Sequence, residues 1–360
     1  MKRLRIISLL VPFLILSCGK QEAPPDSAVL PAGEHAASAP AGKRLKIGYV
    51  LHGLNDFTQV IKRGAEDAGK AMGVDVEVIG PAGFSHTEAI AMFEGMVQKG
   101  VDGIAVIPMP GDVWVKPIKE AKDEKVPVVT ANITSEGAGV DSWFGQDEYQ
   151  SGVILADELK KALGAGGKKS GKIVSGICAP GVAVLVDRFK GFKKALEGTA
   201  YTATDPTDVT TENTSNYAAW ENLASANPDA VAIIGLCSMD IPNLAKLKDK
   251  SKGKWMIGGY DLGKEQLDSL KSGTTQVVLG QHPYLQGYLP VVALVEHIRN
   301  KKPLPRGWVN VGTEVVTKAN AEAVTPRETD HAAETKWYAD HVEKNFKDLN
   351  GVAKPMPANH

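Results

Sequence analysis

The chain has little of what metal centres and nucleic-acid interfaces require. Only three of its 360 residues are cysteine and eight are histidine, and none are grouped with the spacing of metal ligands. Its 41 basic and 42 acidic side chains give a formal net charge of −1, so it has no basic field of the kind that binds DNA or RNA. We therefore expect neither a metal nor a nucleic-acid partner.

Motifs of common catalytic and nucleotide-binding sites are also missing. No Gly-x-Ser-x-Gly sequence is present to place a nucleophilic serine on a strand-to-helix turn. Residues 164–170 are rich in glycine and lysine, but they precede a predicted strand and lack the Gly-Lys-Ser/Thr ending of a phosphate-binding loop. We predict a protein that is not an enzyme and has no cofactor.

The N-terminus has the features of an export signal. A basic start precedes an apolar run of 11 residues, 6–16, and then Ser17. A helix needs about 20 residues to cross a bilayer, so we expect residues 1–17 to be cleaved. Ile15-Leu16-Ser17-Cys18 is similar to a bacterial lipobox, which predicts a lipid on Cys18; the alternative is an ordinary signal with an incidental cysteine.

Residues 18–43 are rich in Ala, Pro, Ser and Glu and too poor in large apolar residues to bury a core. We interpret them as a flexible tether. Together with the lipobox, this predicts an exported protein in the periplasm or on the outer face of the cell membrane, held there by a lipid anchor.

Short β-branched segments alternate with helical stretches through the first half of the body. The expected strands are 45–51, 74–79, 104–107 and 126–130, and the expected helices are 57–72, 87–99 and 112–125. This alternation indicates βαβ units around a parallel sheet. We predict a doubly wound lobe.

The same pattern restarts after residue 147 and predicts a second lobe. The expected strands are 172–177, 201–204, 230–236, 255–260 and 276–280, the helices are 152–163, 183–196, 217–226 and 285–300, and 308–316 is extended. The helix 285–300 and the extended segment 308–316 follow the second lobe, which suggests that the chain crosses between the lobes more than once. We expect crossings near Gln146, Gln281 and Asn310. We therefore expect an N-terminal lobe of 44–146 plus 282–309 and a C-terminal lobe of 147–281 plus 310–326.

The predicted fold class is α/β, with two doubly wound parallel-sheet lobes joined by a hinge of several crossings. Ligands of open α/β sheets bind outside the carboxyl ends of the strands, so two facing lobes should enclose one cleft. The tail, 327–360, has helical character with Trp337, Val342 and Phe346 as apolar anchors. It is either a charged surface helix or a helix that docks a partner.

From Leu45 to about Val316, roughly three quarters of the chain, the sequence resembles the periplasmic sugar-binding proteins of the ribose-binding type, that is, type I periplasmic binding proteins. The resemblance depends on the order and spacing of several modest motifs: KIGYVLHGLNDFTQVIKRGAEDAGK, VDGIAVIPMPGD, VPVVTANI, DRFKGFKKAL, IGGYD and VLGQHP. It implies a binding protein whose lobes close on a sugar.

In the first lobe, the resemblance implies ligand contacts from the loop after the first strand. Asn55 and Phe57 match the family's amide and ring, while Thr58 replaces a second ring. A ring face covers the C–H face of a sugar, and amides bond its hydroxyls. Phe57 could instead be a core ring. Further candidates for the cleft are His52, Asp56, Met109 and Asn132, the last of which matches the family's acidic or amide partner.

In the second lobe, the resemblance assigns ligand contacts to Arg188, Asp261 and Gln281. Arg188 could donate several bonds in a fixed fork, although a solvated helix arginine is the alternative. Asp261 follows Gly258-Gly259-Tyr260 and would accept hydroxyl protons, and Gln281 would be a hinge-side amide. His282 could also face the cleft. Trp114, Trp143, Trp220 and Tyr284 are either stacking rings or, more commonly at strand ends, core residues.

Three positions depart from the ribose-binding pattern. Ile107 and Ile133 replace an Asn and an Arg, and Leu236-Cys237-Ser238 replaces an Asn-Asp pair. These changes argue against ribose itself and predict a pocket that is partly apolar, with Cys237 in its wall.

The two cysteines of the body, Cys178 and Cys237, each follow a strand of the second lobe. If these strands are neighbours, the two sulfurs lie at the same edge of the sheet. An exported protein can then join them by a disulfide; two free buried thiols are the alternative.

The sequence thus predicts the substrate-binding lipoprotein of an ABC importer. It would bind a monosaccharide, polyol or similar small hydroxylated ligand by hinge closure and deliver it to a membrane permease. The alternative is a receptor that presents a sugar or an autoinducer-like ligand to a membrane sensor. A carbohydrate-modifying enzyme is the third and weakest hypothesis.

Overall fold

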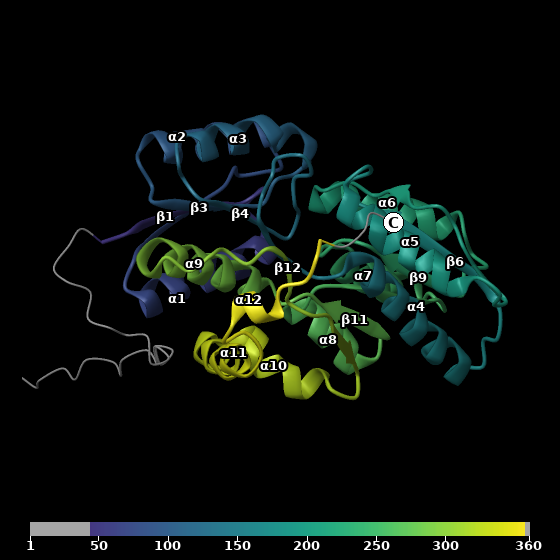
Figure 1. The fold of residues 1–360 in the computed structure, drawn as a ribbon. Coiled ribbons are helices and arrows are strands. Elements are labelled where there is room, and N and C mark those ends of the chain that lie inside the picture. Colours follow the sequence, from purple (N-terminus) through teal and green to yellow (C-terminus); the bar gives the residue numbers. More distant parts are fainter. Residues whose placement is uncertain (1–43, 357–360) are drawn as a thin grey trace, which may run out of the picture.

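The structure is a computed structural model that describes residues 44–356. The predicted signal peptide, the tether, Cys18 and the end of the tail, 357–360, lie outside the described residues. Two lobes lie side by side in Figure 1, and the C-terminal helices, in yellow, run along one side of them. No helix among residues 44–356 combines the length and apolar character that a membrane crossing requires.

The N-terminal lobe contains a six-stranded sheet in the order β12-β5-β4-β3-β1-β2, with every neighbouring pair parallel. Helices cover both faces, which is why β3, β4 and β5 are mostly apolar and are buried throughout (Figure 1). The strands are β1 (Lys46–Val50), β2 (Asp75–Ile79), β3 (Gly103–Val106), β4 (Val128–Ala131), β5 (Ser142–Gly145) and β12 (Gly307–Asn310). The helices are α1 (Asp56–Met72), α2 (His86–Gln98), η1 (Asp112–Trp114), α3 (Val115–Asp123) and α9 (Pro283–Asn300).

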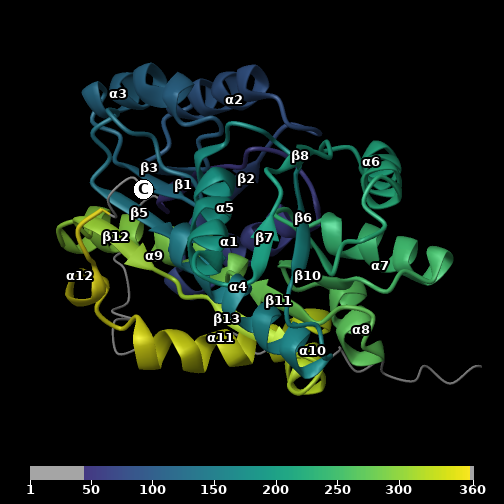
Figure 2. The ribbon, with the colours of Figure 1, turned by 90° about the vertical axis from the view of Figure 1, so that its right-hand side faces the viewer.

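The C-terminal lobe contains a seven-stranded sheet in the order β13-β11-β10-β9-β6-β7, with β8 also paired to β6. Its pairs are parallel except that β13 runs antiparallel to β11. The strands are β6 (Gly171–Ile177), β7 (Tyr201–Ala203), β8 (Thr207–Asp208), β9 (Ala232–Gly235), β10 (Met256–Tyr260), β11 (Val277–Gly280) and β13 (Glu314–Thr317). Helices α4 (Glu148–Ala165) and α5 (Ala183–Leu196) lie on one face of the sheet, and α6 (Asn213–Ser225), α7 (Asp240–Ser251) and α8 (Lys264–Ser272) lie on the other (Figure 2).

The predicted fold class, two doubly wound parallel-sheet lobes, is confirmed. The chain passes between the sheets three times: between β5 and α4, between β11 and α9, and between β12 and β13. The sequence prediction missed β5, α7 and α8, and it wrongly joined β12 and β13 into one extended segment. Gly312 explains the last error, because its φ of 90° turns the chain out of one sheet and into the other.

Paired glycines allow the central helices of each lobe to touch. A Cβ on Gly64 in α1 or on Gly287 in α9 would overlap the backbone of the other helix. The same is true of Gly152 in α4 and Gly191 in α5. The two lobes therefore share one packing device, in which the backbones approach more closely than any residue with a side chain permits.

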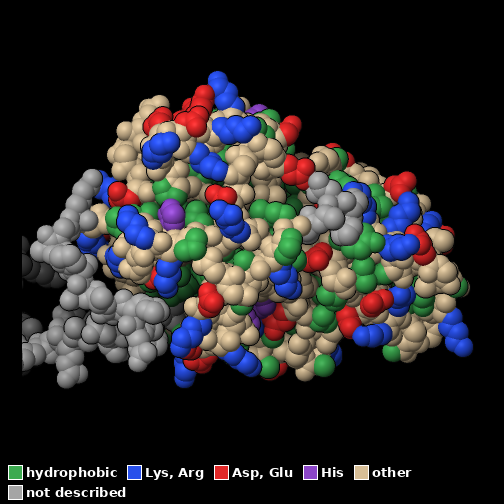
Figure 3. Space-filling view, viewed as in Figure 1, with side chains coloured by type: hydrophobic (Ala, Val, Ile, Leu, Met, Phe, Trp, Pro, Cys, Tyr) green, Lys and Arg blue, Asp and Glu red, His purple; other side chains and the backbone are tan. Residues whose placement is uncertain are grey.

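The tail forms α10 (Ala321–Thr329), α11 (His331–Asn345) and α12 (Leu349–Val352). Of its predicted apolar anchors, Phe346 is buried, whereas Trp337 and Val342 are half-buried. The most buried ring of the tail is Tyr338, which the sequence prediction missed and which is 2% exposed. Acidic and basic side chains are interspersed over the face in Figure 3, so this face has no patch of one charge.

Candidate ligand-binding site

Polar side chains from both lobes meet where the chain crosses between the sheets. Asn132, after β4, donates from Nδ2 to Oε1 of Gln281 at 3.2 Å and to Oε1 of Gln286 at 3.0 Å. Gln281 in turn donates from Nε2 to Oδ1 of Asp261, after β10, at 2.7 Å. All four side chains are buried. Three predicted ligand residues, Asn132, Asp261 and Gln281, thus lie in one hydrogen-bond network.

Arg188 joins this network through a buried ion pair with Glu148. Its Nε and Nη2 donate to Oε2 and Oε1 of Glu148 at 2.6 and 3.0 Å, and both side chains are 4% exposed. The guanidinium also donates to the carbonyl of Leu236 at 2.8 Å and to Gln281 at 3.3 Å, and it lies 4.2 Å from the ring centre of Tyr260. Burial alone would lower the pKa of Arg188, but the charge and the hydrogen bonds of Glu148, together with nearby Tyr260 and Asp261, outweigh burial and raise the pKa.

The alternative of a solvated Arg188 is therefore wrong. Four of its hydrogen bonds are made within the protein, so the arginine holds the site together. Its direct contact with a ligand stays a prediction. Glu148, which the sequence prediction missed, lies 40 residues away in the chain, and only its position at the start of a helix next to a crossing singles it out.

Asp261 has the electrostatics expected of an acceptor in a closed site. Burial raises its pKa to about 6, against the opposing effects of Arg188 and of the bond from Gln281. Its φ is 71°, and Asn132 and His282 also have positive φ, at 60° and 48°. Such left-handed backbone is uncommon outside glycine and is concentrated at functional sites. All three residues lie just after strands, where the prediction places the ligand.

In the first lobe, Asn55 caps helix α1. Its Oδ1 accepts a hydrogen bond from the backbone of Thr58 at 3.0 Å, and the hydroxyl of Thr58 accepts one from the backbone of Asn55 at 2.9 Å. Thr58 is fully buried and also donates to the carbonyl of Gly53 at 2.8 Å. Thr58 is therefore structural, and a ligand contact of Asn55 stays a prediction for its amide nitrogen. Asp56 is exposed in the first turn of α1.

An aromatic group lies beside this cap. His52 is 9% exposed, its Nδ1 has no hydrogen-bond partner, and burial lowers its pKa to about 4, so the ring is neutral near pH 7. Its ring centre lies 6.5 Å from that of Phe57 and 5.2 Å from that of Phe84. Phe84 follows β2 and is 41% exposed. The sequence prediction missed this ring, although a phenylalanine in a loop of glycine and proline is a detectable signal.

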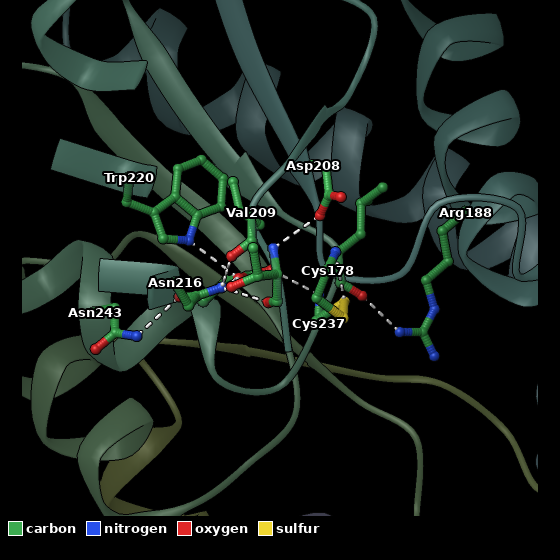
Figure 4. Close-up of a disulfide and its surroundings, with 11 residues drawn as sticks. Cys178, Arg188, Asp208, Val209, Asn216, Trp220, Cys237 and Asn243 are labelled. Carbon is green, nitrogen blue, oxygen red and sulfur yellow. Dashed lines mark hydrogen bonds between the residues drawn. A yellow bond between two sulfur atoms is a disulfide. The ribbon is translucent and has the colours of Figure 1, made fainter. Parts of the chain in front are cut away.

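Cys178 and Cys237 form a disulfide between the ends of the neighbouring strands β6 and β9 (Figure 4). Their Cα atoms are 6.1 Å apart, within the range of natural disulfides. Beside it, the carboxylate of Asp240 accepts from the backbone of Cys237 at 2.9 Å and from the indole of Trp220 at 3.0 Å. The side chain of Cys237 is only 6% exposed, and its sulfur is bonded to that of Cys178. A contact between Cys237 and a ligand stays a prediction.

A cavity of about 310 Å³ borders the network between the lobes. Neither the ten predicted ligand residues nor His282 lines it, although Glu148, Ile133 and Asp187 do. Trp143 also lines it, whereas the other candidate stacking rings, Trp114, Trp220 and Tyr284, are fully buried in the cores.

Of the three apolar replacements, only Ile133 reaches this cavity. Ile107 and Leu236 are fully buried in the core, so they do not form the expected apolar wall in this conformation; Met109 is half-buried. Within residues 44–356, no three His, Cys, Asp or Glu side chains are grouped so that they could hold a metal ion.

Comparisons with known proteins agree with this architecture. A family model described as periplasmic binding protein domain matches residues 47–302. The ribose import binding protein RbsB of Bacillus subtilis is 25% identical over 303 residues, covering 84% of this chain and 94% of that protein. The xylose/arabinose-binding protein XylF of Sulfolobus acidocaldarius is 22% identical, covering 77% of this chain and 72% of that protein.

Among solved structures, the fold is similar to an ABC transporter solute-binding protein from Burkholderia graminis in complex with D-arabinose. The TM-score is 0.73 at 23% identity, covering 78% of this chain and 98% of that chain. The resemblance seen in the sequence motifs is thereby confirmed. Since the family model spans well over half of its residues, the chain belongs to the periplasmic binding protein domain family.

Proposed function

We propose that this protein is the substrate-binding lipoprotein of an ABC importer and that it binds a monosaccharide, polyol or similar hydroxylated ligand between its lobes. The observation that carries the proposal is the network of Asn132, Gln281 and Asp261, which places amide and carboxylate groups from both lobes at one point. A ligand rich in hydroxyls needs such acceptors and donors. Ribose import by the Bacillus subtilis relative supports the same class.

Binding by closure follows from the position of the site. Contacts to Asn132 in one lobe and Asp261 in the other are complete only when the lobes are shut around the ligand. A ligand that binds the shut form more tightly shifts the population toward it, and a permease can then recognise the shut shape. No step of this cycle requires a chemical reaction, and we propose no enzymatic activity.

Export and a lipid on Cys18 would hold the protein beside its permease partner at the membrane. Mass spectrometry of the mature protein tests the anchor, because cleavage before Cys18 would remove residues 1–17 and lipidation of Cys18 would add acyl mass. An unmodified N-terminus after residue 17 would leave an ordinary exported protein. Ligand binding without any transport defect in a deletion strain would favour the alternative role, presentation of the ligand to a membrane sensor.

A thermal-shift screen against sugars, polyols and other small polar metabolites tests the ligand class. A ligand that binds only the native state raises the melting temperature. The variant Asp261→Ala should lose this shift while keeping the fold, because it removes an acceptor from the network. Asp268→Ala is the matched control, since Asp268 is a partly exposed carboxylate of the same lobe that pairs with Lys264 and Lys271. A flat screen with the wild type would contradict the ligand class.

A further inference from the structure

The C-terminal segment contacts both lobes, and we name residues Ala321–Met356 the C-terminal strap. Its first helix, α10, lies against α8 and β13 of the C-terminal lobe, where Arg327 donates a hydrogen bond to Glu314. Its second helix, α11, lies on the N-terminal lobe. Figures 1 and 2 both show the strap in yellow, passing along the two lobes.

Buried polar contacts fasten α11 to the N-terminal lobe. Arg63 of α1 donates to both carboxylate oxygens of Glu334, at 2.8 and 2.9 Å, and Glu334 is 2% exposed. Tyr338 stacks on Tyr284 of α9, with ring centres 4.4 Å apart and planes 8° from parallel. A helix that merely covers the surface does not bury a carboxylate and a tyrosine so fully.

The strap then joins the edge of the N-terminal sheet. The backbones of Trp308 in β12 and Lys354 exchange two hydrogen bonds, at 2.7 and 2.8 Å, in an antiparallel bridge. Two residues later, Met356 lines the cavity between the lobes. The strap is therefore held on one lobe at its start and on the other along the rest of its described length.

The middle crossing lies beneath this strap. The ring of Trp337 stacks on that of His282 at 5.8 Å, and the ring of His341 lies 5.5 Å from it. Nδ1 of His282 is 3.3 Å from the hydroxyl of Tyr338. The guanidinium of Arg327 lies over the ring of Trp337, 4.0 Å from its centre. Contacts thus continue from the C-terminal lobe through the strap to the residue that follows Gln281.

We propose that the C-terminal strap is a fourth connection that restricts the motion of the lobes, and that Trp337 couples it to the hinge through His282. A rotation of one lobe relative to the other must move α10 relative to α11, and Arg327 and Trp337 connect these two helices. This restraint rests on the hinge motion of the proposed function and does not depend on which ligand is bound.

Electron spin-spin distances between the lobes test this inference without a ligand. Spin labels are attached at Lys116→Cys in the N-terminal lobe and Asp205→Cys in the C-terminal lobe, two exposed positions far from the strap in the sequence. The mature chain carries Cys18→Ser, so that only these two thiols react while Cys178 and Cys237 stay joined. Hydrogen exchange of β3 and β9 shows in each variant that both lobes are folded.

We expect Trp337→Ala to broaden the distribution of interlobe distances. Trp337→Phe keeps a ring against His282 and should give a distribution close to that of the wild type. Glu334→Gln, which loosens α11 from Arg63 without removing a ring, should broaden it as well. Glu343→Ala removes only an exposed pair between α11 and Lys347, two residues beyond the end of that helix, and should leave the wild-type distribution. If Trp337→Ala unfolds a lobe, the distance distribution of Glu334→Gln is the test of whether the strap restricts the lobes. Wild-type distributions in the folded variants, or equal broadening in Glu343→Ala, would overturn the proposal.

Discussion

Removing the Cys178–Cys237 disulfide should destabilise the C-terminal lobe by a calculable amount. The bond closes a loop with a sequence separation of 59 residues. In the chain-entropy model such a loop is worth about 4 kcal/mol at 25 °C, because the crosslink restricts the unfolded chain. The pairing of Gly176 with Gly235 in neighbouring strands brings the two cysteines to the same edge of the sheet. For a lobe of this size, this corresponds to a fall of roughly 8 to 16 °C in melting temperature.

The comparison uses urea unfolding of the wild type and of Cys178→Ala/Cys237→Ala, each with and without a reductant. Reductant should lower the unfolding free energy of the wild type to nearly that of the double variant and should leave the variant unchanged. A loss below about 1 kcal/mol in the reduced wild type would refute the reasoning, because it would mean that the crosslink does not restrict the unfolded chain. Two free thiols in the denatured, unreduced wild type would refute the bond itself.

Three further results are expected, each measured by denaturant unfolding. Gly152→Ala should cost about 1 to 3 kcal/mol by overpacking the contact between α4 and α5, whereas Gly95→Ala, which meets nothing within 4 Å, should stabilise α2 by about 0.5 to 1 kcal/mol; equal effects would contradict the packing argument. The raised pKa of Asp261, about 6 against 3.8, means that the native state keeps its proton longer, so this contribution to stability is present below about pH 4 and is lost as the pH rises through 6. The part of the pH dependence due to this group should vanish in Asp261→Asn, and an unchanged slope would show that it titrates normally. Glu148→Gln should cost about 3 to 5 kcal/mol by leaving Arg188 buried without its carboxylate, and Glu148→Gln/Arg188→Met should recover most of this loss; a single variant as stable as the wild type would mean that water reaches the pair.

The candidate site shows how far local patterns reach. The motifs placed Asn132, Asp261 and Gln281 after strands, and the structure joins them in one network. The same motifs assigned Asn55 to a ligand, whereas its side-chain oxygen caps α1, a role that the Asn-x-x-Thr spacing also predicts. Arg188 was expected to bind a ligand, and its four hydrogen bonds lie within the protein. A motif gives the residue type and its place in an element, but it does not give the partner.

The alternation of strands and helices, the two lobes and the family were determined by the sequence alone, because hydrophobic periodicity is a property of neighbouring residues. The sequence prediction missed short or polar elements such as β5, α7 and α8, because tertiary packing supplies most of their stability. The pairing of Glu148 with Arg188, the cavity beside Ile133 and the return of the strap onto α1 and α9 were decided by the tertiary structure. Each joins segments that are distant in the chain, and their contacts exist only once folding has brought the two lobes and the tail together.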